Sequence, residues 1–117
     1  MYFKFRLIVI AIISVLILFL VVIKNFSQNE IETYEITIKD HVFYPDILEI
    51  PQNKKIRLII SNKDDTIEEF ESLDLRRERI IPPMKETSII IGPLNSGKYS
   101  YMGEFHQETA KGLILVK

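Results

Sequence analysis

The N-terminal part of the chain carries one long, uninterrupted apolar run. Residues 7–23 contain no charged side chain, and Ser14 is their one polar residue. At a rise of 1.5 Å per residue, a helix of this length would span about 26 Å, close to the hydrocarbon core of a bilayer at about 30 Å. The run therefore predicts one membrane-spanning helix.

Beyond residue 30 the pattern changes to short alternating runs separated by turn residues. Tyr34, Ile36 and Ile38 alternate with polar residues, the period of a strand with one buried face. Comparable runs predict further strands at 47–50, 56–60, 68–72, 87–91, 99–102 and 112–117. The segment 73–84 is less regular and contains Pro82-Pro83, which cannot donate ladder hydrogen bonds, so it predicts no strand.

About seven short strands with turns between them predict an all-β domain, a β-sandwich preceded by the apolar helix. In such a sandwich we expect Leu58, Phe70, Ile89 and Tyr101 to point inward.

The charges that flank the apolar run predict its orientation. Lys4 and Arg6 precede it, whereas Lys24 follows it and acidic residues come soon afterwards. The positive-inside rule therefore places residues 1–6 in the cytoplasm, 7–23 in the lipid bilayer as a signal anchor, 24–30 as a tether, and 31–117 as an extracytoplasmic domain on the periplasmic side of the inner membrane. A cleaved signal peptide is the alternative. The run is long for one, and no small-residue cleavage site follows it.

Composition excludes several kinds of function. The chain has no cysteine, which removes thiolate nucleophiles, Cys-based zinc sites and iron–sulfur clusters. Residues 31–117 hold 12 Lys and Arg against 15 Asp and Glu, so they have no basic footprint for nucleic acid. We find no Gly-rich phosphate loop, nucleophile elbow or His pair at i, i+4, and we predict that the protein is not an enzyme.

Several short motifs follow one another in order through the predicted domain. They are Lys39-Asp40-His41 with Phe43-x-Pro45, Pro51, Asn62-Lys63-Asp64-Asp65-Thr66, Glu68-Glu69-Phe70-Glu71-Ser72, Gly92-Pro93-Leu94, Gly97-x-Tyr99, and Gly103-Glu104-Phe105-His106-x-x-Thr109-Ala110-x-Gly112. With this order and spacing, residues 34–116 resemble the cupredoxin-like domains associated with bacterial iron and copper uptake. These include the N-terminal domain of the periplasmic iron-uptake protein that accompanies high-affinity iron permeases. The resemblance implies a Greek-key β-sandwich that binds copper or iron.

The resemblance also indicates where a blue-copper protein would carry its ligands. The first His falls at Glu68, the Cys at Gly103, the second His at His106 and the Met near Ala110. One of four ligands is thus retained, and without the thiolate a blue-copper centre cannot form. The family resembled here has itself lost that Cys.

Five residues are candidate metal ligands. They are His106, Glu68, Glu69, His41 and Glu104. His106 follows the predicted strand at 99–102, and imidazole is a common metal ligand. Alternation puts Glu68 on the same inward-facing side of its strand as Phe70. Each also has a structural alternative. His106 would be a surface residue, and His41 would cap its strand through hydrogen bonds. The Glu residues would form a solvated acidic edge, its charge repulsion reduced by Arg76, Arg77 and Arg79. Met102 and Met84 would be soft ligands suited to Cu(I), although a Met side chain more often packs against other apolar residues.

His and carboxylate ligands favour Cu(II), Fe or Zn(II) over Cu(I). The leading hypothesis is a membrane-anchored extracytoplasmic domain that binds copper or iron. The resemblance implies metal uptake or handling beside a permease or a periplasmic uptake protein. The alternative is a metal-free β-sandwich that binds a partner protein. A third hypothesis, an accessory electron-transfer or oxidase subunit, is disfavoured by the missing Cys.

Overall fold

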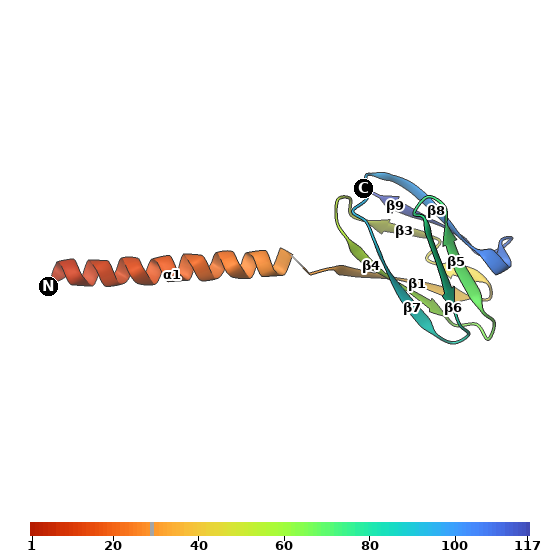
Figure 1. The fold of residues 1–117 in the computed structure, drawn as a ribbon, viewed down its shortest axis with the longest axis horizontal. Helices are drawn as coiled ribbons and strands as arrows, with labels where there is room; N and C mark the ends of the chain where they lie inside the picture. Colours follow the sequence, from red (N-terminus) through yellow and green to blue (C-terminus); the bar gives the residue numbers. More distant parts are fainter. Residues whose placement is uncertain (29) are drawn as a thin grey trace. The chain divides into compact units, whose positions relative to one another are not determined.

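The computed structural model describes residues 1–28 and 30–117, which fall into two compact units, Met1–Glu30 and Ile31–Lys117 (Figure 1). The first unit is the helix α1, Tyr2–Gln28. A stretch of 18 residues within Tyr2–Ser27 has a mean hydropathy of 3.3 and none of it is buried, so by length and composition this helix can cross a membrane. The helix extends beyond the predicted 7–23, because Lys and Arg at its ends favour helix and can reach toward water.

The second unit is a sandwich of two β-sheets, as the alternating pattern predicts (Figure 1). Its strands are β1 (Glu32–Lys39), β2 (Val42–Tyr44), β3 (Ile47–Ile50), β4 (Ile56–Asn62), β5 (Glu68–Ser72), β6 (Arg77–Ile81), β7 (Glu86–Ile91), β8 (Gly97–Gly103) and β9 (Lys111–Val116). One sheet has the order β2-β1-β4-β7 and the other β3-β9-β8-β5-β6. The pairs β1–β4 and β3–β9 are parallel, and the other pairs are antiparallel.

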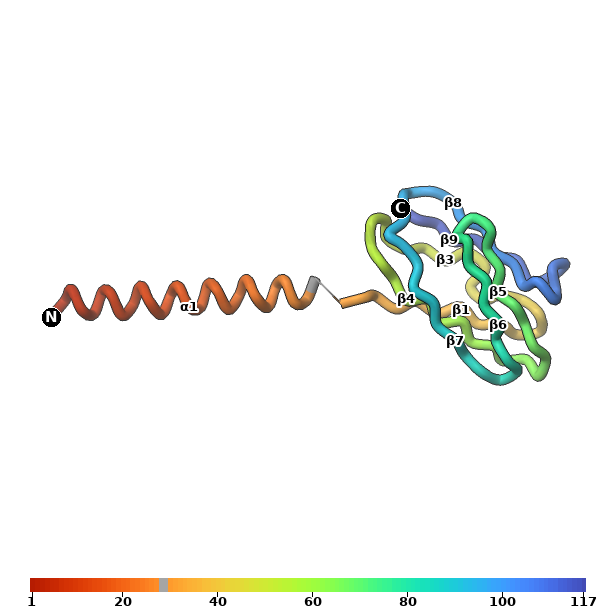
Figure 2. The backbone as a smooth tube through the Cα atoms, in the orientation of Figure 1, coloured from red at the N-terminus to blue at the C-terminus, as the bar shows by residue number. Residues whose placement is uncertain are grey.

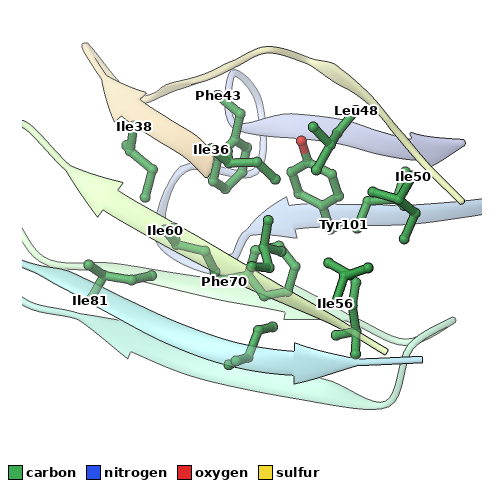
Figure 3. Packing of buried hydrophobic residues seen from close by; sticks show 14 of the residues in the cluster. Ile36, Ile38, Phe43, Leu48, Ile50, Ile56, Ile60, Phe70, Ile81 and Tyr101 are labelled. Atoms are coloured by element: carbon green, nitrogen blue, oxygen red, sulfur yellow. The ribbon is translucent and has the colours of Figure 1, made fainter. Parts of the chain in front are cut away.

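The core lies between the two sheets and contains the residues that were expected to point inward (Figure 3). Leu58, Phe70, Ile89 and Tyr101 are at most 3% exposed. Three aromatic rings meet at its centre, where Tyr101 lies 5.0 Å from Phe43 and 5.1 Å from Phe70 between ring centroids. Each such buried side chain contributes about 1.5–3 kcal/mol through removal of apolar surface from water.

Two strands were not predicted from the sequence. β2 is too short to show any periodicity. β6 is an edge strand whose residues are exposed except Ile81, so its sequence Arg-Glu-Arg-Ile-Ile does not alternate. The prediction that 73–84 contains no strand was therefore wrong, although β6 does end directly before Pro82.

The register brings several loops together at one end of the sandwich. β1 and β4 end there, paired at Ile38 and Asn62, and β5 begins there beside Gly103, the last residue of β8. Figure 2 shows the turn after β1 and the loop after β8 at the same end of the domain. The chain enters β1 at the opposite end. Eight residues of strand separate the two ends by about 26 Å.

Candidate metal centre

Glu68 begins β5 and points into the sandwich on the same face as Phe70. It is only 1% exposed. Its Oε1 accepts the backbone N–H of Glu69 at 2.9 Å and that of Phe105 at 3.0 Å, and its Oε2 lies 2.5 Å from Nδ1 of His106. A buried carboxylate requires such partners because desolvation is costly. Glu68 therefore is not part of a solvated acidic edge, and its Oε2 is the oxygen that can bind an ion.

His106 ends the short 3-10 helix η1 (Glu104–His106) in the connection from β8 to β9. Its backbone carbonyl accepts the N–H of Ala110 at 2.8 Å and that of Thr109 at 3.2 Å, which closes the loop. The imidazole is 27% exposed. The loop thus holds the ring against Glu68 with one side open to solvent.

His41 lies in the turn between β1 and β2. The hydroxyl of Thr109 donates to its carbonyl at 2.6 Å, which joins this turn to the loop that carries His106. The two imidazoles stack, with ring centroids 3.6 Å apart and planes 11° from parallel. The chain has two histidines, and the fold brings both of them to one place.

His41, Glu68 and His106 together offer a set of metal ligands. One ligand atom from each lies within 4.8 Å of the others. Two imidazole nitrogens and one carboxylate oxygen suit Cu(II), Zn(II) or Fe(II). Ligand bonds of about 2 Å in a tetrahedral site would put ligand atoms about 3.3 Å apart. Because Oε2 of Glu68 and Nδ1 of His106 lie closer together than this, an ion would separate these two groups slightly.

Two of the five candidate ligands lie outside this group. Glu69 is on the opposite face of β5 by alternation. Glu104 hydrogen-bonds the carboxyl of Glu71, and this bond, with some burial and the nearby charge of Glu104, raises the pKa of Glu71 to about 7. Met84 is mostly exposed, and Met102 lines a surface hollow beside Glu71. None of these side chains belongs to the group formed by His41, Glu68 and His106.

Gly103 provides the space that the buried carboxylate occupies. A Cβ at this position would lie 2.7 Å from Cδ of Glu68 and 2.7 Å from Cβ of Ala110. The backbone of Gly103 is extended, with φ −88° and ψ 111°, so glycine is needed here for space rather than for conformation. The four positions aligned with blue-copper ligands do meet, and the Glu68 carboxylate fills the room that a Cys side chain would need.

Asp64 also contacts this site, in a role that no sequence pattern indicated. Its carboxylate accepts the backbone N–H groups of Asp40 and His41. Burial opposes ionisation of Asp64, but these two donors and the neighbouring imidazoles outweigh it and hold its pKa below the usual range. An Asp in a polar turn is common, so only the folded structure distinguishes it from Asp65.

Comparisons with known proteins agree with this architecture. A family model described as Cupredoxin-like domain matches residues 10–116. The uncharacterized protein RP394 of Rickettsia prowazekii (strain Madrid E) is 56% identical over 90 residues, which are 77% of this chain and 72% of that protein.

Two solved structures illustrate the likeness of fold. The metal binding domain of the Cu(I) exporting P-type ATPase CopA of Streptococcus pneumoniae D39 has a TM-score of 0.67 at 14% identity, covering 76% of this chain and 88% of that chain. Auracyanin A, a blue copper protein of Chloroflexus aurantiacus, has a TM-score of 0.64 at 10% identity, covering 75% and 100%. From the family match and the shared sandwich, the chain belongs to the cupredoxin-like domain family.

Proposed function

We propose that the domain binds a divalent transition-metal ion, Cu(II) first, through His41, Glu68 and His106. The convergence of both histidines on a buried carboxylate carries this proposal. Three ligand atoms within 4.8 Å are close enough for one ion to bridge, which favours a metal site over a metal-free interaction module. Copper ranks first because divalent affinities rise toward Cu(II) and because structural relatives are copper proteins. Iron and zinc are the competing ions.

The ligand set supports metal handling rather than electron transfer. The chain has no thiolate for a blue-copper bond, and a carboxylate lies in that space. Cupredoxins are mostly electron-transfer or metal-binding proteins rather than enzymes. We propose the metal-binding role for this chain. It would receive or deliver an ion during uptake, beside a metal permease or a periplasmic uptake protein.

The helix and the position of the site constrain how that role would work. In this proposal α1 anchors the chain with its N-terminus in the cytoplasm and holds the domain outside the membrane. The site lies at the end of the sandwich away from Glu32, about 26 Å along β1. A partner that exchanges the ion would therefore need an extracytoplasmic part that contacts this end of the domain.

Metal content of the purified full chain tests the proposal. After loading with Cu(II), Zn(II) or Fe(II) in detergent and removal of excess metal, we expect one ion per chain. His106→Ala and Glu68→Gln should abolish retention. Glu69→Gln is the matched control, because this neighbour lies on the other face of the same strand, and it should bind normally. Retention far below one ion per chain, or unchanged retention in His106→Ala, would refute the metal site.

A further inference from the structure

Asp64, in the connection between β4 and β5, holds the turn that carries His41. Its Oδ1 accepts the N–H of Asp40 at 2.7 Å, and its Oδ2 accepts that of His41 at 3.0 Å. The same Oδ2 lies 3.5 Å from Nδ1 of the His41 ring. One carboxylate, with its side chain 11% exposed, thus contacts both the backbone and the imidazole of a proposed ligand.

The turn requires such a partner because its backbone is unusual. Asp40 and His41 have φ values of 52° and 59°, the left-handed region that residues other than glycine seldom adopt. Two such residues in succession cost free energy unless the surroundings hold them. Both of their N–H groups donate to the Asp64 carboxylate, whose negative charge strengthens these hydrogen bonds. The position of His41 therefore depends on this carboxylate.

Asp64 is itself fixed by the core of the domain. Its N–H donates to Oδ1 of Asn62 at 3.0 Å, and its carbonyl accepts the N–H of Met84 at 3.0 Å. Asn62 is buried, and its amide donates to the carbonyls of Thr66 at 2.8 Å and Ile81 at 3.1 Å. A hydrogen-bonded path thus leads from the buried end of β4 to the backbone of His41, and Oδ2 of Asp64 also lies beside its ring.

We infer that Asp64 is a positioning residue of the metal site, one that orients the His41 imidazole for an ion. The inference rests on the proposed function. Asp64 Oδ2 lies beside Nδ1 of His41 and would favour the tautomer with its proton on Nδ1, which leaves the lone pair of Nε2 for the metal. Carboxylates that orient histidine ligands commonly contribute 10–100-fold to metal affinity. Asp64 touches no ion and acts through His41.

Chelator competition with Zn(II) and Cu(II) on the full chain in detergent tests this role. Asp64→Asn keeps one acceptor oxygen and should weaken binding about 10-fold, and Asp64→Ala up to about 100-fold. Asp74→Asn is the matched control. Asp74 accepts the N–H and hydroxyl of Ser100 at 2.8 and 3.0 Å, in the turn at the other end of β5, and its replacement should leave affinity unchanged. Equal affinity of Asp64→Asn and wild type would overturn the inference.

A double-mutant cycle separates positioning from general damage. In a His41→Ala background, Asp64→Asn should weaken binding no further, because its route to the ion is gone. If Asp64→Asn lowers metal affinity by the same factor in the His41→Ala background as in the wild type, the inference is contradicted.

Imidazole NMR spectra of the metal-free protein give a second readout. The stacked rings should show ring-current shifts, and Asp64→Asn should move both toward free histidine. Unchanged spectra would overturn the role of Asp64. If the wild type binds neither ion, the proposed function fails, whereas these spectra still decide whether Asp64 orients His41.

Discussion

Glu68 and His106 are separated by 38 positions in the sequence, yet Oε2 of the first lies 2.5 Å from Nδ1 of the second. The contact joins the buried start of β5 to the loop between β8 and β9. This contact gives both groups a polar partner in the metal-free protein, and an ion bound between them would take its place.

Gly103→Ala should damage both the fold and the site. The added methyl group would press on the Glu68 carboxyl and on Ala110, and overpacking of this kind costs about 1–3 kcal/mol. We expect a lower free energy of unfolding in denaturant titrations and weaker metal retention. Gly103→Ala with Ala110→Gly should recover the part of the loss that comes from Ala110. Wild-type stability and binding in the single variant would contradict the packing described at Gly103.

Glu71→Gln should raise stability above neutral pH. The usual pKa of Glu71 is 4.5, and in the fold it is about 7, raised by the hydrogen bond to Glu104, by some burial and by neighbouring acids. Between these pH values the folded protein holds a proton that the unfolded chain has released, so stability falls as pH rises from about 4.5 to about 7.

Thermal unfolding of Glu71→Gln and wild type at pH 5 and pH 8 measures this effect. The variant should gain more in Tm at pH 8 than at pH 5. Glu86→Gln, at an exposed position on β7, serves as the control and should show no such difference. An equal effect of Glu71→Gln at both pH values would mean that the pair with Glu104 does not share a proton.

Phe70→Ala should destabilise the sandwich by about 3–5 kcal/mol, because it empties a fully buried aromatic site at the centre of the core. Leu73→Ala, three residues further on at a side chain that is 75% exposed, should have little effect. Denaturant titration of both variants measures the difference. Similar losses in the two would contradict the inward direction of Phe70, and with it that of Glu68.

The anchor proposal predicts that the C-terminus lies outside the cytoplasm and that α1 is retained. A reporter fused after Lys117 should be active only in the extracytoplasmic space, and the chain should stay in the membrane fraction with its N-terminus intact. Lys4→Glu with Arg6→Glu should reduce correct orientation, because these charges precede the apolar run. A shortened, soluble product would instead favour the cleaved signal peptide.

Much of the fold could be predicted from the sequence because its inward residues alternate. The strands at 47–50 and 68–72 have the predicted bounds. Asp46 and Pro51 flank the first, and the second begins and ends at the polar residues Glu68 and Ser72. β6 could not be recognised in this way, because an edge strand exposed on both sides carries no periodicity.

The site was predictable only in part. Alternation placed Glu68 on the inward face of β5, as found. His41 and His106 were candidates by residue type, but their stacking depends on long-range register between loops. The roles of Asp64 and Gly103 were missed because they lie in a hydrogen bond across 23 positions and in an empty volume, neither of which leaves a local pattern.

Electron paramagnetic resonance of the Cu(II)-loaded full chain tests the central claim most directly. We expect hyperfine coupling to two imidazole nitrogens, reduced to one in His41→Ala. We also expect no intense thiolate-to-copper absorption band. A loaded His41→Ala protein whose spectrum keeps the same nitrogen coupling as wild type would contradict a site formed by His41, Glu68 and His106.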